Sequence, residues 1–357
     1  MTKRAFSSHY ACVHTRLWIS GGSDLIVHFA MNPWERNKLK SKVRQFGKGL
    51  MRCDQCHTIL SIEGLAPLSL MRCGRCKCMN VIPMLLADFW LHQPLGGGGS
   101  GVVYLAYWLH RGKRCAVKVL RSGENRNDNT IAGLQKEAST LADVGRHPCI
   151  VRLLSSGISN DECFMAMEYI EGERLDNRIA RLGTIPEKEA LRMLLYLLAA
   201  EKHIFRRGYL YGDMKPENII FKQNNLPVLI DFGMCMKTDE AARRKKAFVG
   251  GSPYYLPPER LQKDPEGPYS EIYALGMIMY TALTSGTFFK FTGNVQDLAM
   301  KHIQTARMSV TQAMLPMCNP ATVEMLGRMI RKDPSERYQT FEEVELVAMQ
   351  IFRRIKR

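Results

Sequence analysis

Apolar and polar residues follow two different periods along this chain. Residues rich in β-branched and aromatic side chains predict four strands, at 102–107, 114–120, 150–154 and 164–169. Residues 130–144 separate these strands and carry apolar side chains at helical spacing, at Ile131, Leu134, Ala138 and Leu141. Later stretches predict amphipathic or core helices over residues 186–207, 269–286 and 321–356. The pattern therefore predicts a strand-rich part that is followed by a helix-rich part.

No apolar run is long enough to cross a membrane. Residues 194–200 (LLYLLAA) are flanked by Arg192 and Glu201, whereas a spanning helix needs about 18 apolar residues. Residues 25–30 are too short for the apolar region of a secretion signal, and no small-residue cleavage site follows them. We therefore expect a cytoplasmic protein without a membrane span.

Composition adds a charge asymmetry to this picture. The 357 residues are 46% apolar and 24% charged, which excludes wholesale disorder and collagen-like repeats. The net charge is +16, and residues 1–50 hold nine basic against two acidic side chains. We expect residues 1–48 to form a flexible, solvated basic leader. An anionic membrane, nucleic acid or an acidic partner could also bind such a run, and these are the less favoured interpretations.

Five of the eleven cysteines lie close together before residue 80. Cys53 and Cys56 form one C-x2-C pair, and Cys73 and Cys76 form another after sixteen intervening residues. Two such pairs can direct four thiolates at one tetrahedral ion, which is typical of zinc sites. A closed four-thiolate shell leaves no position for a substrate, so we expect structural zinc.

The cysteine-rich segment, residues 49–84, resembles a zinc ribbon. Cys78 and His57 are spare donors, and either could replace one of the four nominal ligands. A redox-active thiol pair is the less favoured alternative. The other six cysteines are scattered among apolar neighbours and are interpreted as core residues in a reducing compartment.

A glycine-rich segment directly precedes the strand predicted at 102–107. Gly96, Gly98 and Gly101 give G-x-G-x-x-G, which alone also fits a linker or a dinucleotide-binding turn. Because a strand follows at 102–107, we place the glycines in a hairpin rather than at the start of a helix. Lys118 lies on the next strand, which suits a flap of backbone amides over phosphate oxygens beside a point charge.

The most specific pattern lies at residues 211–233. Residues 211–218 read Tyr-Gly-Asp-Met-Lys-Pro-Glu-Asn, and Asp-Phe-Gly begins 13 residues after Asn218. Carboxylate and amide oxygens from two loops are suited to hard cations. Residues 251–259 then read Gly-Ser-Pro-Tyr-Tyr-Leu-Pro-Pro-Glu.

Together these segments resemble the eukaryotic-like (Hanks-type) serine/threonine protein kinases over about 260 residues. The resemblance implies an α+β, bilobal fold, with a β-rich N-lobe at 89–168 and a helical C-lobe at 172–357, preceded by the small zinc ribbon. It implies phosphoryl transfer from ATP to serine or threonine hydroxyls of protein substrates, with Mg²⁺ as cofactor. Lys215, two positions after Asp213, marks the serine/threonine subclass.

The resemblance also assigns roles residue by residue. Asp213 would accept or orient the proton of the attacking hydroxyl, and Lys215 would neutralise the γ-phosphoryl group. Asn218 and Asp231 would hold up to two Mg²⁺ ions. The ATP site would comprise the glycine hairpin, a lysine–glutamate pair, the gatekeeper, the hinge and one residue of the C-lobe: Leu95, Gly96, Gly98, Gly101, Val103, Ala116, Lys118, Glu137, Met167, Glu168, Ile170 and Ile220.

Further residues would shape the substrate groove or support the catalytic loop. Ser252 lies where a hydroxyl usually bonds the catalytic aspartate and lysine, and Glu259 would pair with Arg337. Glu271 stands where the family has an aspartate that braces the catalytic loop. Gly212 replaces the arginine that receives an activation-loop phosphate, so we expect weak dependence on that phosphorylation.

Two alternatives to an active protein kinase remain open. A pseudokinase scaffold would bind nucleotide and partners; absence of Lys118, Asp213 or Asp231 would favour it, and all three are present. A kinase-like enzyme could instead act on a small molecule, although such families generally lack a segment like 251–259. The basic run at 243–246 is interpreted as a solvated loop, with preference for an acidic substrate or self-docking as alternatives.

Overall fold

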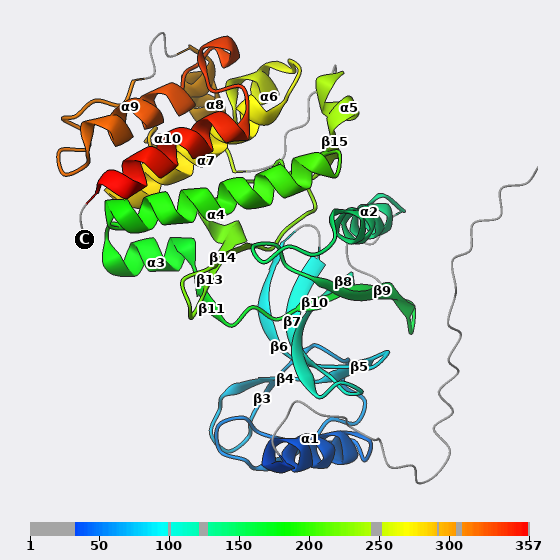
Figure 1. Ribbon diagram of the computed structural model, residues 1–357. Coiled ribbons are helices and arrows are strands. Elements are labelled where there is room, and N and C mark those ends of the chain that lie inside the picture. Colours follow the sequence, from blue (N-terminus) through cyan, green and yellow to red (C-terminus); the bar gives the residue numbers. More distant parts are fainter. Residues whose placement is uncertain are drawn as a thin grey trace, which may run out of the picture.

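The structure is a computed structural model that describes residues 33–98, 101–120, 128–243, 252–290, 293–304 and 309–355. Figure 1 shows three tiers: a helical lobe, an antiparallel sheet below it, and a module of short strands with helix α1 at the far end. The chain starts in this small module, continues into the sheet and ends in the helical lobe.

The cysteine-rich module consists of two antiparallel hairpins, each with three residue pairs. They are formed by β1 (Leu50–Arg52) with β2 (Ile59–Ser61) and by β3 (Leu70–Arg72) with β4 (Met79–Val81). The residue after the second cysteine of each pair adopts a left-handed conformation, with φ 58° at His57 and 64° at Lys77. The two halves thus repeat one local geometry around a small core: Met51, Cys53, Leu60, Ile62, Cys73 and Ile82.

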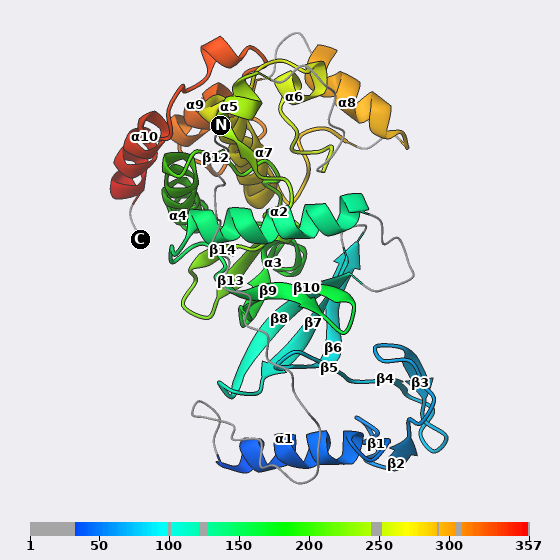
Figure 2. The ribbon, with the colours of Figure 1, turned by 90° about the vertical axis from the view of Figure 1, so that its right-hand side faces the viewer.

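Helix α1 (Pro33–Phe46) packs beside the module and against the sheet (Figure 2). Leu39 is buried in a cluster with Trp90 and Leu109. The ring of Phe46 meets that of Trp90 edge to face, with 4.8 Å between the centroids. These apolar contacts fix the helix to the sheet.

This helix corrects the expectation of a flexible leader over residues 1–48. Residues 33–46 are helical because one apolar stripe lies between their many basic side chains, and a count of charges does not reveal it. Residues 1–32 lie outside the described part of the chain.

The central sheet has six antiparallel strands in the order β5-β6-β7-β8-β10-β9. They are β5 (Met84–Leu86), β6 (Phe89–Gly98), β7 (Gly101–Trp108), β8 (Lys113–Leu120), β9 (Leu153–Ser159) and β10 (Glu162–Glu168). Strand β5 directly follows the cysteine-rich module, and Leu68 of the module packs into the same core as Phe89 and Phe164. The module is therefore continuous with the sheet.

Three of the four predicted strands are confirmed, and the one at 150–154 is wrong in part. Strand β9 begins only at Leu153, whereas Ile150 forms a single bridge with Leu229 of the helical lobe. Helix α2 (Asp128–Val144), the one predicted at 130–144, lies across the strands β9 and β10 (Figure 2).

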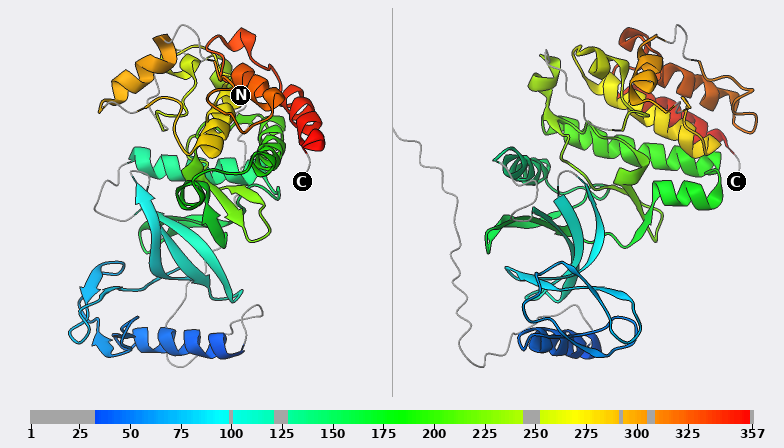
Figure 3. Two further views of the ribbon diagram at one scale, coloured as in Figure 1. Left: turned by 90° about the vertical axis from the view of Figure 1, so that its left-hand side faces the viewer. Right: turned by 180° about the vertical axis from the view of Figure 1, so that it is seen from behind.

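The helical lobe is built around α4 (Glu187–Arg206) and α7 (Pro268–Thr284), which pack against each other (Figure 3). The other helices are α3 (Leu175–Leu182), α5 (Thr238–Ala242), α6 (Pro258–Gln262), α8 (Val295–Gln304), α9 (Pro320–Met329) and α10 (Phe341–Arg354). Short elements carry the loops between them: β11 (Gly172–Arg174), β12 (Tyr209–Leu210), η1 (Pro216–Asn218), β13 (Ile219–Lys222), β14 (Pro227–Leu229), β15 (Met236–Lys237) and η2 (Pro334–Glu336).

The helix predicted over 321–356 is two helices, α9 and α10. Asp333 accepts the Ser335 N–H and starts η2 with Pro334 in its first turn, which ends the helical run. Thr340 then caps α10 by accepting the Glu343 N–H. Among the described helices, none has the length and apolar character that crossing a membrane requires.

Candidate active site

Strand register brings several expected ATP-site residues onto one face of the sheet. Val103 on β7 lies opposite Lys118 on β8, which lies opposite Met165 on β10. Ala116, two residues before Lys118, lies opposite Met167. Because alternate residues of a strand share a face, these side chains line one surface.

The glycine hairpin between β6, which ends at Gly98, and β7 borders this surface. Gly101 has φ +119°, and a Cβ there would lie 2.8 Å from the Val119 carbonyl oxygen, so the backbone requires glycine. Gly96 pairs across the hairpin, and a shift in the ladder beside it leaves Leu95 as an extra residue that is 41% exposed.

The lysine–glutamate pair forms as predicted. Lys118 Nζ donates to Glu137 Oε2 at 2.7 Å, and the two side chains are 5% and 3% exposed. Burial raises the pKa of Glu137, and the nearby Lys118 opposes that rise. A Cβ added to Gly233 would lie 3.3 Å from Asp231 Oδ1 and 3.4 Å from Glu137 Oε2, so the pair meets the Asp-Phe-Gly loop.

The segment that leaves β10 connects the sheet to the helical lobe. Glu168 donates its N–H to the Arg152 carbonyl at 2.9 Å, and its carboxylate accepts the Arg152 N–H at 3.0 Å. Ile170 follows as a buried residue. Ile220 is half-buried on β13, in the helical lobe. The register and these positions are compatible with a nucleotide-binding hinge.

The loop between β12 and β13 gathers two polar side chains around the carboxylate of Asp213. Lys215 Nζ donates to Asp213 Oδ2 at 2.6 Å. Asn218 Nδ2 donates to the same oxygen and to the Asp213 carbonyl, at 2.9 Å each. Asp213 is only 6% exposed, and these contacts compensate for its burial.

The oxygen donors of this loop and of the Asp-Phe-Gly loop fit Mg²⁺. Asn218 uses its amide nitrogen on Asp213, which leaves the amide oxygen as an acceptor. Asp231 accepts the Gly233 N–H at 3.0 Å through Oδ1, which leaves Oδ2 for another partner. Hard divalent cations prefer such oxygens.

Tyr211 occupies the position where the family has a structural histidine. Its ring meets Phe232 edge to face, with 5.2 Å between the centroids. The side chain is fully buried, and its hydroxyl has no hydrogen-bond partner among the described residues. The aromatic ring therefore supports the Asp-Phe-Gly loop by packing rather than by a hydrogen bond.

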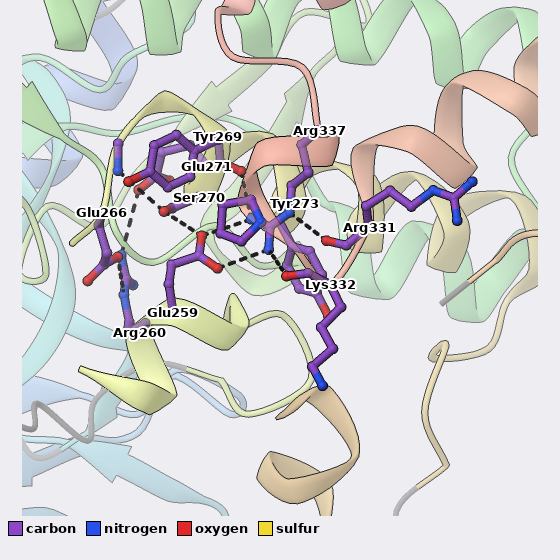
Figure 4. Close-up of polar contacts among 12 residues, drawn as sticks. Glu259, Arg260, Glu266, Tyr269, Ser270, Glu271, Tyr273, Arg331, Lys332 and Arg337 are labelled. Carbon is purple, nitrogen blue, oxygen red and sulfur yellow. Dashed lines mark hydrogen bonds and ion pairs between the residues drawn. The ribbon is translucent and has the colours of Figure 1, made fainter. Parts of the chain in front are cut away.

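Glu259 and Arg337 form the expected pair (Figure 4). The two guanidinium nitrogens donate to the two carboxylate oxygens at 2.8 and 2.9 Å. Arg337 is 1% exposed and also donates to three backbone carbonyls, those of Tyr269, Arg331 and Lys332. This bidentate pair joins the first turn of α6 to the loop before α10.

Ser252 and Glu271 both lie beside the loop that carries Asp213. Ser252 lines the same small hollow as Asp213, and no hydrogen bond joins these two described residues. Glu271 Oε1 accepts the N–H of Gly212 at 3.0 Å. Within the basic run at 243–246, the structure describes only Arg243.

Arg260 was not among the predicted site residues. This residue is 4% exposed, donates to the Gly212 carbonyl, and pairs with Glu266, with 2.5 Å between Nη2 and Oε2 (Figure 4). Its Nη2 also lies 3.7 Å from Glu271 Oε1. The sequence around Arg260 gives no local signal for this contact, because Gly212 lies 48 residues earlier.

The four predicted zinc ligands converge in the cysteine-rich module. The sulfurs of Cys53, Cys56, Cys73 and Cys76 all lie within 4.8 Å of one another. Two of the separations are 3.5 and 3.7 Å. Bonds of about 2.3 Å to a tetrahedral ion place sulfurs roughly 3.8 Å apart, so the site fits zinc. Backbone N–H groups, that of Cys56 first, lower the pKa of Cys53 to about 5, which favours the thiolate.

Cys78 is the closest additional donor to this cluster. Its sulfur lies 3.2 Å from that of Cys53 and 3.3 Å from that of Cys76. It occupies the position of Thr58 in the other hairpin, whose hydroxyl accepts from the Cys56 thiol at 3.3 Å. The repeat therefore favours Cys78 as a neighbour of the ligands. His57 is not among the grouped ligand atoms.

Comparison with known proteins agrees with this geometry. The profile of the family described as "Protein kinase domain" matches residues 89–349. Serine/threonine-protein kinase PrkC of Bacillus subtilis is 30% identical over 255 residues, which cover 70% of this chain and 38% of that protein. A probable serine/threonine-protein kinase PknB of Lactococcus lactis is 29% identical over 272 residues, or 74% of this chain and 42% of that protein.

The similarity covers only part of each relative. Serine/threonine-protein kinase pkn2 of Myxococcus xanthus is 28% identical over 288 residues, which cover 78% of this chain and 33% of that relative. The matches thus span well under half the length of these relatives. The family profile nevertheless covers more than half of this chain, and the buried lysine–glutamate pair and the Asp213 loop lie within the match. The chain belongs to the protein kinase family.

Proposed function

We propose that this chain is an active serine/threonine protein kinase, which transfers the γ-phosphoryl group of ATP to hydroxyls of protein substrates. The observation that carries the proposal is that two sets of side chains which such a transfer needs are held together by hydrogen bonds and ion pairs. Lys118 is paired with Glu137 on one side, and Asp213 is bonded to Lys215 and Asn218 on the other. The names of the relatives support serine/threonine specificity.

These side chains would each have a separate role in the transfer. Lys118 places a positively charged amine at a fixed position for the α- and β-phosphates, because its ion pair with Glu137 orients it. Asp213 orients the attacking hydroxyl, and Lys215 places a positive charge beside it. Asn218 and Asp231 would hold Mg²⁺, which when bound neutralises charge on the phosphate oxygens.

A pseudokinase and a small-molecule kinase remain the alternatives. The intact Lys118, Asp213 and Asp231 argue against a scaffold without catalysis. The Glu259–Arg337 pair anchors a segment that shapes a peptide groove in protein kinases, which argues for a protein substrate.

We also infer that the cysteine-rich module binds one structural zinc ion through Cys53, Cys56, Cys73 and Cys76. Two of these four thiols, those of Cys53 and Cys73, are fully buried, which suits a closed site rather than a catalytic one. Such an ion would supply folding energy that hairpins of three residue pairs cannot obtain from their small core.

Transfer of labelled phosphate from ATP to a generic basic protein tests the kinase proposal. Wild type, Asp213→Asn and a control, Asp88→Asn, are compared with Mg²⁺ present. Asp88 is a partly exposed carboxylate directly before β6 that pairs with the exposed His110. Wild type and the control should label serine and threonine, and Asp213→Asn should lose at least about 100-fold in rate.

Equal labelling by wild type and Asp213→Asn would refute the catalytic assignment. Binding of ATP by wild type without any transfer would favour the pseudokinase. Label on tyrosine alone would contradict the serine/threonine subclass.

A further inference from the structure

The backbone before Asp213 is held by two buried side chains from outside its own loop. The N–H of Gly212 donates to Glu271 Oε1 on α7 at 3.0 Å. The carbonyl of Gly212 accepts from the guanidinium of Arg260 on α6. Both polar groups of this one residue are therefore fixed by the helical lobe.

These two contacts set the direction in which Asp213 leaves the backbone. A peptide unit is planar, so the Gly212 carbonyl and the Asp213 N–H rotate together as one peptide plane. Because Arg260 binds the Gly212 carbonyl, it fixes the peptide plane that ends at the Cα of Asp213, and with it the direction of the Asp213 side chain. Glu271 holds the preceding peptide plane, because its carboxylate accepts the N–H of Gly212. Free rotation of either peptide plane would move the Asp213 carboxylate.

Arg260 is neutralised by carboxylates that are part of the fold. Glu266 accepts from Nε at 2.7 Å and lies 2.5 Å from Nη2, while Glu271 lies 3.7 Å from Nη2. The side chains of Glu266 and Glu271 are 0% and 2% exposed. A guanidinium that is buried this deeply needs carboxylate or phosphate partners. Here Glu266 and Glu271 supply the negative charge, so no phosphorylated residue is needed beside Arg260.

An arginine at position 212 itself could not do the same work in this structure. Gly212 has φ +80°, and a Cβ there would lie 2.7 Å from the Met234 carbonyl oxygen and 3.6 Å from Arg260 Nη2. The space beside Gly212 is thus already occupied by Arg260, which comes from a different part of the sequence.

We propose that Arg260 is a positioning residue for phosphoryl transfer, which holds the Gly212–Asp213 peptide and thereby aims the Asp213 carboxylate. The proposal rests on the proposed kinase function. It assigns to Arg260, with Glu266 and Glu271, the support that the missing catalytic-loop arginine does not supply.

Steady-state kinetics of four full-length proteins test this assignment. Arg260→Met removes the donor and the charge, whereas Arg260→Lys keeps a cation and one flexible donor. Lys202→Met is the control, because it breaks a different ion pair, the partly buried one with Glu345 on α10, which involves no residue of the loop at 211–218. Circular dichroism gives the folded fraction of each protein, and kcat is expressed per folded molecule.

Wild type should transfer phosphate, and Arg260→Met should lower kcat by about 10- to 100-fold while KM for ATP stays within about twofold. The kcat of Arg260→Lys should lie between those of wild type and Arg260→Met. A lysine can donate to the Gly212 carbonyl, but it cannot also bind Glu266 through two nitrogens as arginine does. Lys202→Met should keep the wild-type kcat even where it lowers the melting temperature.

Three results would overturn the assignment. One is a kcat for Arg260→Met equal to that of Lys202→Met, and another is a raised KM for ATP with unchanged kcat. The third is a kcat for Arg260→Lys no higher than that of Arg260→Met. All three leave the kinase function standing. A wild-type protein that transfers no phosphate would instead refute the proposed function, and this inference with it.

Discussion

At the scale of single residues, the polar groups under the catalytic loop show how closely backbone and charge are matched. Gly212 is a glycine because its left-handed backbone approaches the carbonyl of Met234, and Arg260 fills the space that a side chain would have used. Glu201 lies in the same buried region without any hydrogen-bond partner among the described residues. Each of these two residues leads to a measurement.

Gly212→Ala should impair both stability and catalysis. Gly208 provides a matched control, because its φ is +81° but nothing lies within 4 Å of the added Cβ. Gly208→Ala should cost only the left-handed penalty of about 1 kcal/mol, whereas Gly212→Ala adds a clash with backbone and should cost about 2 to 4 kcal/mol. Chemical denaturation and kcat measure the two effects. Equal losses in the two variants would contradict the close approach at Gly212.

Glu201→Gln should stabilise the protein increasingly as pH rises. Burial raises the pKa of Glu201 well above 4.5, Glu271 adds to the rise, and Arg260 opposes it. Above pH 4.5 the unfolded chain has lost this proton while the folded chain keeps it, so raising the pH disfavours the folded wild type. The unfolding free energy of Glu201→Gln minus that of wild type should grow by about 1.4 kcal/mol per pH unit from pH 4.5 until the pH reaches the raised pKa of the folded carboxyl. A difference that stays constant between pH 5 and 7 would show that Glu201 is ionised in the folded protein.

At the scale of elements, the two cysteine hairpins have the same backbone but different residues after the second cysteine. Thr58 and Cys78 take equivalent positions, each beside the thiol of the preceding cysteine. Because Thr58 has no thiol, this equivalence favours Cys76 over Cys78 as the expected zinc ligand of the second hairpin.

Cys78→Thr should keep one zinc ion per chain, because it copies the arrangement of the first hairpin. Cys53→Ser should lose zinc, since Cys53 is a fully buried member of the four-sulfur group. Metal analysis and the visible spectrum of the cobalt-substituted protein give the stoichiometry and the number of thiolate ligands. Loss of zinc from Cys78→Thr, with zinc retained in Cys76→Ser, would make Cys78 the ligand.

The elements also show what the sequence could predict. Strands and helices with a strong period were predicted, because spacing within a strand or helix is a local property. The pair of Lys118 on β8 with Glu137 on α2 was predicted only from the family resemblance, since no local period joins two elements. Helix α1 was missed because its apolar face packs against Trp90 and Leu109, which are both distant in sequence. Arg260 was missed for the same reason, since its partner Gly212 lies 48 residues earlier and no local pattern joins them.

At the scale of the whole molecule, the cysteine-rich module, the sheet and the helical lobe form a continuous series of packed contacts. Strand β5 pairs with β6, which carries the glycine hairpin at its other end. Leu68 of the module is buried in the core of the sheet. The module is thus positioned to influence the strand that borders the candidate nucleotide site.

Removal of the zinc ligands should therefore weaken the kinase. A Cys53→Ser and Cys73→Ser double variant should lose its zinc, melt at a lower temperature and transfer phosphate more slowly than Cys78→Thr, its zinc-retaining control. The reason is that β5 and Leu68 lose the folded module next to them. Unchanged melting temperature and rate in the zinc-free variant would make the module an independent recruiting unit.

We expect the residues around Lys118 and Asp213 to bind ATP together with Mg²⁺. Isothermal titration of the zinc-loaded, full-length protein with ATP and excess Mg²⁺ measures this directly. One nucleotide should bind per chain, and Lys118→Met should weaken the binding by about tenfold or more, since it removes the buried cation that Glu137 orients. An absence of nucleotide uptake by the wild-type protein, at any concentration of divalent ion, would contradict the claim.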